Sequence, residues 1–237
     1  TNDGRVSEYT ANELNQYSQR TVPGGFTVYG AAETGATVTV NNGAVTRLYN
    51  VIDGVPTEMQ KFWHKDMTVT NTSDAVYQPV NVVGVYNPPG TNQDVVTVSS
   101  GNVFVAETPE GFEYDADGNL TQDGRWAYSW DGENRLIGVE TADGMETVVP
   151  KMKLGFTYDF QSRRVSKTVS VWSNSAWAAI QTNIFIYDGW NLLAEVIKTP
   201  AQQATNQYVW GLDLSGSLQG AGGIGGYYGG RLLEAGR

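Results

Sequence analysis

"FEYDADGNLTQDGRWAYSWDGENRLIGVE", residues 112–140, contains one short pattern twice. In each copy an aromatic residue and an Asp lead into a small polar turn, and a leucine follows the turn. The pattern returns as "YDFQSRRV" (158–165) and "YDGWNLL" (187–193). Its aromatic positions, 114, 130, 158 and 187, are 16, 28 and 29 residues apart, which indicates an irregular repeat of β-hairpins. The repeat motif comprises Tyr114, Asp115, Gly118, Leu120, Trp130, Asp131, Leu136, Tyr158, Asp159, Val165, Tyr187, Asp188 and Leu192.

The residues around each Asp predict short strands joined by tight turns. In "RWAYSW" (125–130), Trp126, Tyr128 and Trp130 alternate with smaller or polar residues, so the three rings share one face of a strand. The turns "DADGN" and "DGEN" are rich in residues suited to positive φ. We therefore expect each Asp to be a turn residue, whose carboxylate accepts a backbone N–H two residues on and fixes the register of the next strand.

The composition and the patterning divide the chain into four segments and predict an all-β fold. Residues 1–20 hold a partial copy of the repeat phrase, residues 21–106 lack it, residues 107–210 carry the repeats, and residues 211–237 are rich in glycine. Alternating runs such as "ATVTVNN", bounded by turn residues, predict an immunoglobulin-like β-sandwich for residues 21–106. This segment reads as an insertion between repeats.

Four copies of the pattern, followed by "YVWGLDLSGSLQGAGGIGGYY" (208–228), resemble the YD repeats of the Rhs family and the lead-in to its repeat-associated core. The resemblance covers about residues 107–228 and, more loosely, residues 1–20. It implies a β-sheet that spirals into a shell around a C-terminal polypeptide, often a toxin, outside the cell or at the surface of a bacterium. The chain would then be a structural fragment without chemistry of its own. Its partners would be the remainder of a larger YD-repeat polypeptide or the enclosed cargo, and open sheet edges would favour self-association.

Charge, composition and motif spacing argue against several other kinds of partner. A formal net charge of −10 argues against nucleic-acid binding, and no apolar run is long enough for a membrane-spanning helix. The sequence contains no cysteine, so thiolate metal sites are excluded. "GAGGIG" (220–225) matches a dinucleotide-binding motif in its glycines but lacks the flanking strand and helix. "DADGN" does not fit an EF-hand loop, so we expect no metal and no cofactor.

Two alternatives to a structural role remain open. The first is a carbohydrate- or surface-binding module that uses exposed aromatic rings, with Trp126, Tyr128 and Trp130 as candidates, although strand alternation predicts that most tryptophans point inward. The second is a hydrolase, either a glycosidase with a carboxylate pair or an esterase that uses the single histidine. Its candidate catalytic residues are Asp115, Glu113 and His64.

Overall fold

The computed structural model describes residues 5–52, 55–217, 220 and 227–234, and it confirms the all-β prediction. This part of the chain consists of strands, turns and loops, apart from one 3₁₀ turn, η1 (Met145–Thr147). The chain divides into two compact units, unit 1 (residues 1–112) and unit 2 (residues 113–237). Within the described ranges, no helix is long and apolar enough to cross a membrane.

Unit 1 contains a small three-stranded sheet in which the third strand comes from a distant part of the chain. Its order is β1 (Tyr9–Ala11), β2 (Tyr17–Arg20), β10 (Glu110–Gly111). Arg20 lies opposite Glu110, so the chain between β2 and β10 leaves and returns at neighbouring strands. The Arg20 guanidinium contacts the buried Glu110 carboxylate at 2.5 Å, and the buried Asn71 amide donates to the carbonyls of Val22 and Ala106. These contacts tie the two ends of the intervening segment together.

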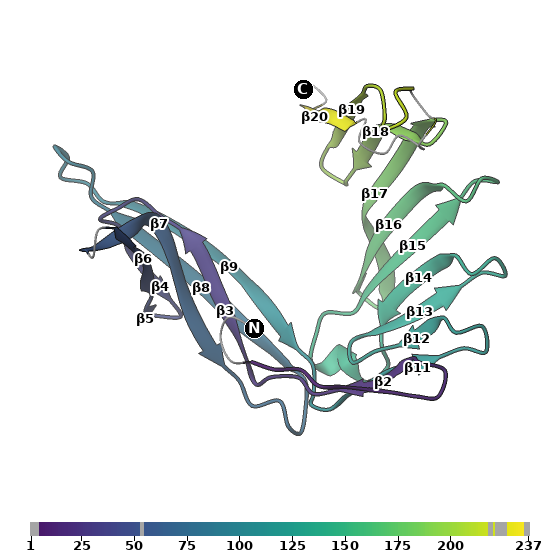
Figure 1. Ribbon diagram of the computed structural model, residues 1–237, viewed down its shortest axis with the longest axis horizontal. Helices are drawn as coiled ribbons and strands as arrows, with labels where there is room; N and C mark the ends of the chain where they lie inside the picture. Colours follow the sequence, from purple (N-terminus) through teal and green to yellow (C-terminus); the bar gives the residue numbers. More distant parts are fainter. Residues whose placement is uncertain (1–4, 53–54, 218–219, 221–226, 235–237) are drawn as a thin grey trace. The chain divides into compact units, whose positions relative to one another are not determined.

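The intervening strands form two antiparallel sheets around one core (Figure 1). The sheet orders are β3-β7-β6 and β5-β4-β8-β9. The core takes Val38 and Val40 from β4, Trp63 from β7 and Val80 from β8. The strands are β3 (Gly25–Ala31), β4 (Thr37–Val40), β5 (Gly43–Ala44), β6 (Thr46–Ile52), β7 (Val55–Thr68), β8 (Val76–Tyr86) and β9 (Val95–Val105).

Strand alternation and one glycine explain how this core packs. Val38 and Val40 are buried whereas Thr37 is exposed, as a period of two requires. Gly30 on β3 lies opposite Trp63 on β7, and a Cβ at Gly30 would meet the indole ring at 2.6 Å. The absence of a side chain at Gly30 therefore leaves the space that the Trp63 ring occupies.

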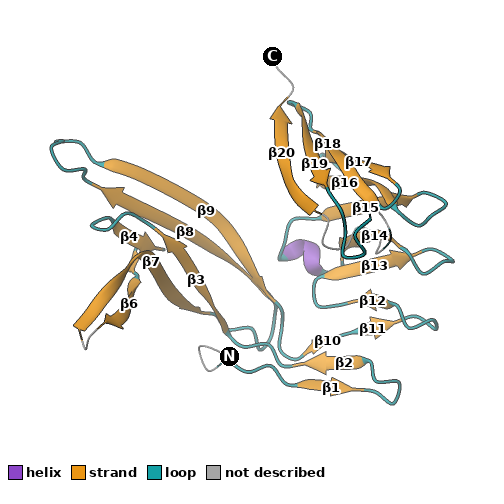
Figure 2. Ribbon diagram, turned by 45° about the horizontal axis from the view of Figure 1, so that its top comes forward, coloured by secondary structure: helices purple, strands orange, loops and turns teal. Residues whose placement is uncertain are grey.

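Unit 2 is one ten-stranded antiparallel sheet in which each strand pairs with its neighbours in the chain (Figures 1 and 2). A register shift occurs directly before each of five aromatic residues, Tyr114, Trp130, Tyr158, Tyr187 and Trp210. Such shifts bend and twist a strand, so the same distortion recurs once per repeat. The strands are β11 (Glu113–Tyr114), β12 (Leu120–Gln122), β13 (Trp126–Trp130), β14 (Leu136–Thr141), β15 (Met152–Tyr158), β16 (Arg164–Ser173), β17 (Ala176–Asp188), β18 (Asn191–Lys198), β19 (Gln203–Trp210) and β20 (Tyr227–Glu234).

Candidate functional site: a row of Asx loops

The turn after Trp130 has a defined hydrogen-bond pattern around Asp131. The Asp131 Oδ1 atom accepts the backbone N–H groups of Glu133 and Arg135, at 2.9 and 3.0 Å. The Asp131 carbonyl accepts the N–H of Asn134, and the Asp131 N–H donates to the carbonyl of Arg135. Asn134 has a φ of 57°, in the left-handed region. The three residues between Asp131 and Arg135 thus form a tight hairpin loop that ends in a left-handed residue.

Four further loops repeat this pattern, and we name the five together the Asx loops. In each, a side-chain oxygen of the first residue, Asp or Asn, accepts the N–H two residues on, and the fourth residue has a positive φ. The hydrogen bond expected of Asp115, Asp131 and Asp159 is therefore present. Asp188 differs, because it pairs directly with Asn191 and only two residues lie between the strands. The Asx loops cover residues 12–16, 115–119, 131–135, 159–163 and 213–217.

Hydrogen bonds to the carboxylates of Asp115, Asp131 and Asp159 lower the pKa values of these three groups. The largest cause is the Asn119 amide for the pKa of Asp115, and the Arg135 backbone N–H for the pKa of Asp131. Burial acts to raise the pKa of Asp159, but hydrogen bonds from the side chain and backbone of Arg163 outweigh it and lower that pKa. The carboxylates therefore stay ionised at neutral pH, and donors from the same loop surround them.

The aromatic residues Trp130, Tyr158, Tyr187 and Trp210 each donate a hydrogen bond to the backbone of the preceding repeat. Three of the four acceptors are carbonyls of the leucines in the sequence pattern. The aromatic position must therefore carry a donor, which explains why Tyr and Trp rather than Phe occupy it. The four bonds run from Trp130 Nε1 to Leu120 (2.8 Å), Tyr158 Oη to Leu136 (2.8 Å), Tyr187 Oη to Arg164 (3.0 Å) and Trp210 Nε1 to Leu192 (2.7 Å).

Neighbouring Asx loops of unit 2 are also joined through their side chains. The Asn119 amide donates to the side-chain oxygen of Asn134 at 2.8 Å. The Arg135 guanidinium donates to the carbonyl of Asp159 at 3.4 Å and lies over the ring of Tyr158, 5.2 Å from its centroid. A hydrogen bond and a cation–π contact therefore link one arginine to the next repeat.

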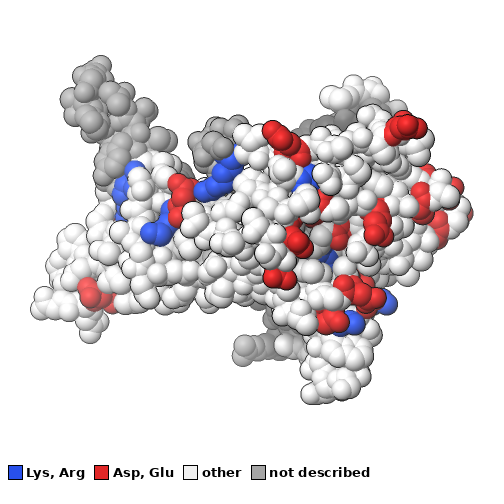
Figure 3. Space-filling view, turned by 90° about the horizontal axis from the view of Figure 1, so that it is seen from below, with Lys and Arg blue, Asp and Glu red and all other residues white. Residues whose placement is uncertain are grey.

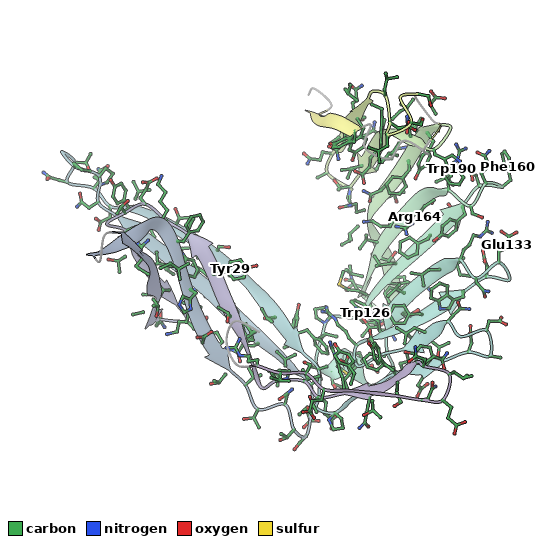
Figure 4. All side chains as sticks on the ribbon, viewed as in Figure 1. Tyr29, Trp126, Glu133, Phe160, Arg164 and Trp190 are labelled. Carbon is green, nitrogen blue, oxygen red and sulfur yellow. The ribbon has the colours of Figure 1, made fainter. Side chains whose placement is uncertain are left out.

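Arg163 has the same role as Arg135, one loop later. Its guanidinium donates to the carbonyl of Gly189 and lies 5.2 Å from the centroid of the Tyr187 ring. Like Arg135, it is also 2.8 Å from the carboxylate of the Asp that begins its own loop. A row of polar contacts thus runs from the loop at 115–119 to the turn at 189–190. Figure 4 shows Glu133, Phe160 and Trp190 at the tips along this edge of the sheet.

The candidate stacking residues Trp126, Tyr128 and Trp130 lie half-buried on β13. The Tyr128 hydroxyl donates to Asp123 at 2.6 Å, and Trp130 is bonded to Leu120. The Arg125 guanidinium covers the ring of Trp126, 4.6 Å from its centroid (Figure 4). Contacts within the sheet thus engage all three rings. The exposed tryptophans are Trp172 and Trp190, whose exposed fractions are 46% and 58%.

The candidate catalytic residues lie in different environments. Asp115 begins an Asx loop, and its two carboxylate oxygens accept hydrogen bonds from Asp117 and Asn119. Glu113 is exposed on β11. His64 is half-buried on β7 in unit 1, opposite Tyr29 in the strand register. Because Asp115 is held in its ionised form, it is poorly suited to donate a proton as a general acid.

Sequence reasoning missed two members of the Asx-loop set and one polar network. Asn12 and Asp213 lack the aromatic residue directly before them, although "NELNQ" and "DLSGS" carry the same turn chemistry. The Glu195 carboxylate accepts hydrogen bonds from Asn183 and Asn206 at 2.6 and 2.9 Å, from neighbouring strands of the sheet. The pairing register brings these residues together, so no local signal in the sequence could have indicated the network.

The described residues offer no cluster of three or more His, Asp or Glu side chains that could hold a metal ion. Most of the "GAGGIG" match (220–225) lies outside the described residues. The face shown in Figure 3 is mostly uncharged, with Asp and Glu side chains and some Lys and Arg side chains distributed over it.

No model of a known protein family matches the chain. Among curated proteins, it is 29% identical over 138 residues to the tRNA3(Ser)-specific nuclease WapA of Bacillus spizizenii. It is 28% identical over 138 residues to the tRNA nuclease WapA of Bacillus subtilis, and 31% identical over 110 residues to the tRNA(Glu)-specific nuclease WapA of Bacillus subtilis subsp. natto. These matches cover 53%, 53% and 46% of this chain. The chain spans only 4–5% of the length of these relatives.

Proposed function

We propose that the ten-stranded sheet is a section of an Rhs-type YD-repeat wall, and that residues 21–106 are an immunoglobulin-like insertion between repeats. In this proposal the wall encloses or presents a C-terminal polypeptide, in a bacterial protein that acts at the cell surface or outside the cell. The observation that carries the proposal is the row of Asx loops, in which each repeat is bonded to the next. Asn119 contacts Asn134, Arg135 contacts Asp159, and Arg163 contacts Gly189.

The row of contacts supports a wall because successive repeats use similar connections. The aromatic residue bonds backward to the preceding hairpin, and the arginine of the loop bonds forward to the following one. A hairpin joined in this way presents the same connection to the next hairpin, so the sheet can be extended by further copies. The register shift before each aromatic residue bends every unit at the same place, which favours a curved sheet.

The curated relatives support a role within a long polypeptide. Each is named a tRNA nuclease, and this chain aligns with about one-twentieth of its length. We infer that a nuclease activity of that kind would lie outside these 237 residues. The net charge of −10 and the occupied carboxylates of the Asx loops support that inference.

The proposal is tested by the size of the native protein. An antibody raised against residues 112–140 should detect a band far above 25.8 kDa in an immunoblot of the source cells and their medium. A single band at 25.8 kDa would exclude a wall that requires many more repeats. In parallel, the 237-residue chain should leave bulk tRNA intact under conditions in which a control ribonuclease degrades it. Cleavage of tRNA by this chain would contradict the inference that the nuclease activity lies outside these residues.

A second candidate function is saccharide binding at the loop tips. The rings of Phe160 and Trp190 are 91% and 58% exposed, and they lie at neighbouring tips of the same edge (Figure 4). Exposed aromatic faces of this kind can stack on sugar rings. Binding to cellohexaose or chitohexaose should weaken at least tenfold in Phe160→Ala. Trp172→Ala is the matched control, because Trp172 is exposed elsewhere and its loss should leave binding unchanged.

A further inference from the structure

Strand β9 lies at the edge of its sheet and carries no charged residue, proline or bulge. It is the outermost strand of the sheet β5-β4-β8-β9, and in the described part of the chain its ladder is with β8 alone. That ladder runs from Val95 to Val105 without a register shift. The sequence "VVTVSSGNVFV" contains no charged residue and no proline. Edge strands of soluble proteins normally carry a charge, a proline or a bulge that prevents pairing with other strands, and β9 has none of these protections.

Both faces of β9 are apolar near its N-terminal end. Val96 and Val98 are 58% and 61% exposed on one face. On the other face, Val95 and Thr97 line a cavity of about 640 Å³ between the sheets β3-β7-β6 and β5-β4-β8-β9. Strands that are apolar on both faces are typical of the interior of a sheet, where both faces are covered. The N-terminal end of β9, residues 95–98, therefore has the composition of an inner strand, although β9 lies at an edge in this structure.

The cavity is lined by the edge strands of both sheets. β3 is the outermost strand of the sheet β3-β7-β6 and contributes Val28 and Tyr29, and β9 contributes Val95, Thr97 and Ser99. The Tyr29 side chain is 81% exposed (Figure 4). Two sheets thus end beside one apolar cavity, each with an unpaired edge among the described residues. A neighbouring strand that extends the sheet would pair with the backbone N–H and C=O groups of the edge. The same neighbour would also cover the cavity.

We propose that this neighbour is a second copy of the chain, with β9 of one copy paired antiparallel to β9 of the other. The residue order of β9 supports self-pairing, since its two ends are apolar and its middle, "SSGN" (99–102), is polar. Antiparallel pairing about Ser100 sets Val95 opposite Val105 and Val96 opposite Phe104. The uncharged strand also avoids the repulsion that identical charges would cause at a two-fold axis. The result is an isologous dimer with one eight-stranded sheet across it.

The first test is the oligomeric state of the 237-residue chain. Sedimentation equilibrium should show a dimer, and Val96→Lys combined with Val98→Lys should weaken dimerisation at least tenfold, because two buried charges at the edge oppose strand addition. The control pair is Val6→Lys with Val209→Lys, since these valines are 59% and 61% exposed at other sites, and it should leave the dimer intact. A monomer at all accessible concentrations would overturn the proposal. A dimer that tolerates the β9 substitutions would overturn it as well.

The second test locates the two-fold axis and does not depend on the lysine variants. The chain has no cysteine, so single spin labels can be placed on Val96→Cys, Val98→Cys, Ser100→Cys and Asn102→Cys. Antiparallel pairing requires the distance between labels of the two copies to pass through a minimum on β9 and to rise by about 14 Å for every two residues away from it, given 3.4 Å per residue in each strand. Distances without such a minimum would show that the copies meet at another surface.

Discussion

Different interactions specify the strand pairing of the two units. In unit 2, each strand pairs with its neighbour in the chain, and side-chain contacts recur at the turns, as between Asp131 and Arg135 and between Asp159 and Arg163. In the β3–β9 part of unit 1, β3 pairs with β7 and β4 with β8, so the pairing is non-local. That part relies on a shared core, in which Val40 is 0% and Trp63 is 5% exposed. Unit 2 is thus specified by repeated turn chemistry, and the β3–β9 part by packing between distant segments.

The substitution with the largest expected effect removes the Trp63 side chain. Trp63→Ala should lower the free energy of unfolding of unit 1 by about 3–5 kcal/mol, because it deletes a buried aromatic side chain from the core. The other six tryptophans all lie in unit 2, so tryptophan fluorescence of the variant reports on unit 2 alone. In urea, the unit 1 part of the far-UV circular dichroism transition should move to lower denaturant while the fluorescence transition stays. Equal shifts of both signals would show that the two units unfold together.

The turn chemistry of unit 2 predicts a loss of stability in acid. The pKa values of Asp115, Asp131 and Asp159 are lowered in the folded state, so their contribution is complete above the unfolded pKa of about 3.9 and is lost as the pH falls through the folded values. The urea midpoint followed by fluorescence should therefore fall between about pH 4.5 and pH 3. The double variant Asp131→Asn with Asp159→Asn should show a shallower fall. An unchanged pH dependence would mean that other carboxylates control acid unfolding.

The sequence predicted the turns of unit 2 well because the chemistry of each turn is local. The hydrogen bonds that the Asp131 carboxylate accepts from the backbone all lie within residues 131–135. The alternation of Trp126, Tyr128 and Trp130 is visible just before this loop. The loops at Asn12 and Asp213 were missed because neither residue is directly preceded by an aromatic residue, as the Asp of the repeat pattern is. A search for the turn alone, Asp or Asn followed three residues on by a residue that tolerates positive φ, would have included both.

The contacts between elements could not be predicted in the same way. The bond from Tyr158 to the Leu136 carbonyl depends on the register of β14 and β15, which no short stretch encodes. The core of unit 1 depends on Trp63 meeting Gly30 across 33 residues of chain. Likewise, only the sheet order shows that β9 lies at an edge. The candidate loops were therefore accessible from sequence, and the row that joins them was not.

The backward bond of the aromatic residue can be tested by removing one oxygen atom. Tyr158→Phe should lower the free energy of unfolding of unit 2 by about 0.5–1.5 kcal/mol, because the Leu136 carbonyl loses its 2.8 Å donor while the packing of the ring is kept. Tyr29→Phe is the control, since Tyr29 is 81% exposed and its variant should be neutral. Urea denaturation followed by fluorescence measures both. A neutral Tyr158→Phe would mean that the ring acts through packing and the cation–π contact with Arg135 alone.

The smallest expected effect concerns the left-handed position of the Asx loops. Asn15, Gly118, Asn134, Ser162 and Gly216 occupy it with φ values of 62°, 87°, 57°, 61° and 74°, and serine is the least suited of them to that conformation. Ser162→Gly should therefore raise the free energy of unfolding by roughly 0.5 kcal/mol, because relief of the left-handed strain exceeds the added entropy of the unfolded chain. The weak 3.4 Å contact between Arg135 and the Ser162 hydroxyl is lost in the variant, which keeps the gain small. The reciprocal change, Gly118→Ser, should lower the urea midpoint. If both changes shift the midpoint in the same direction, the five loops do not share one conformational requirement.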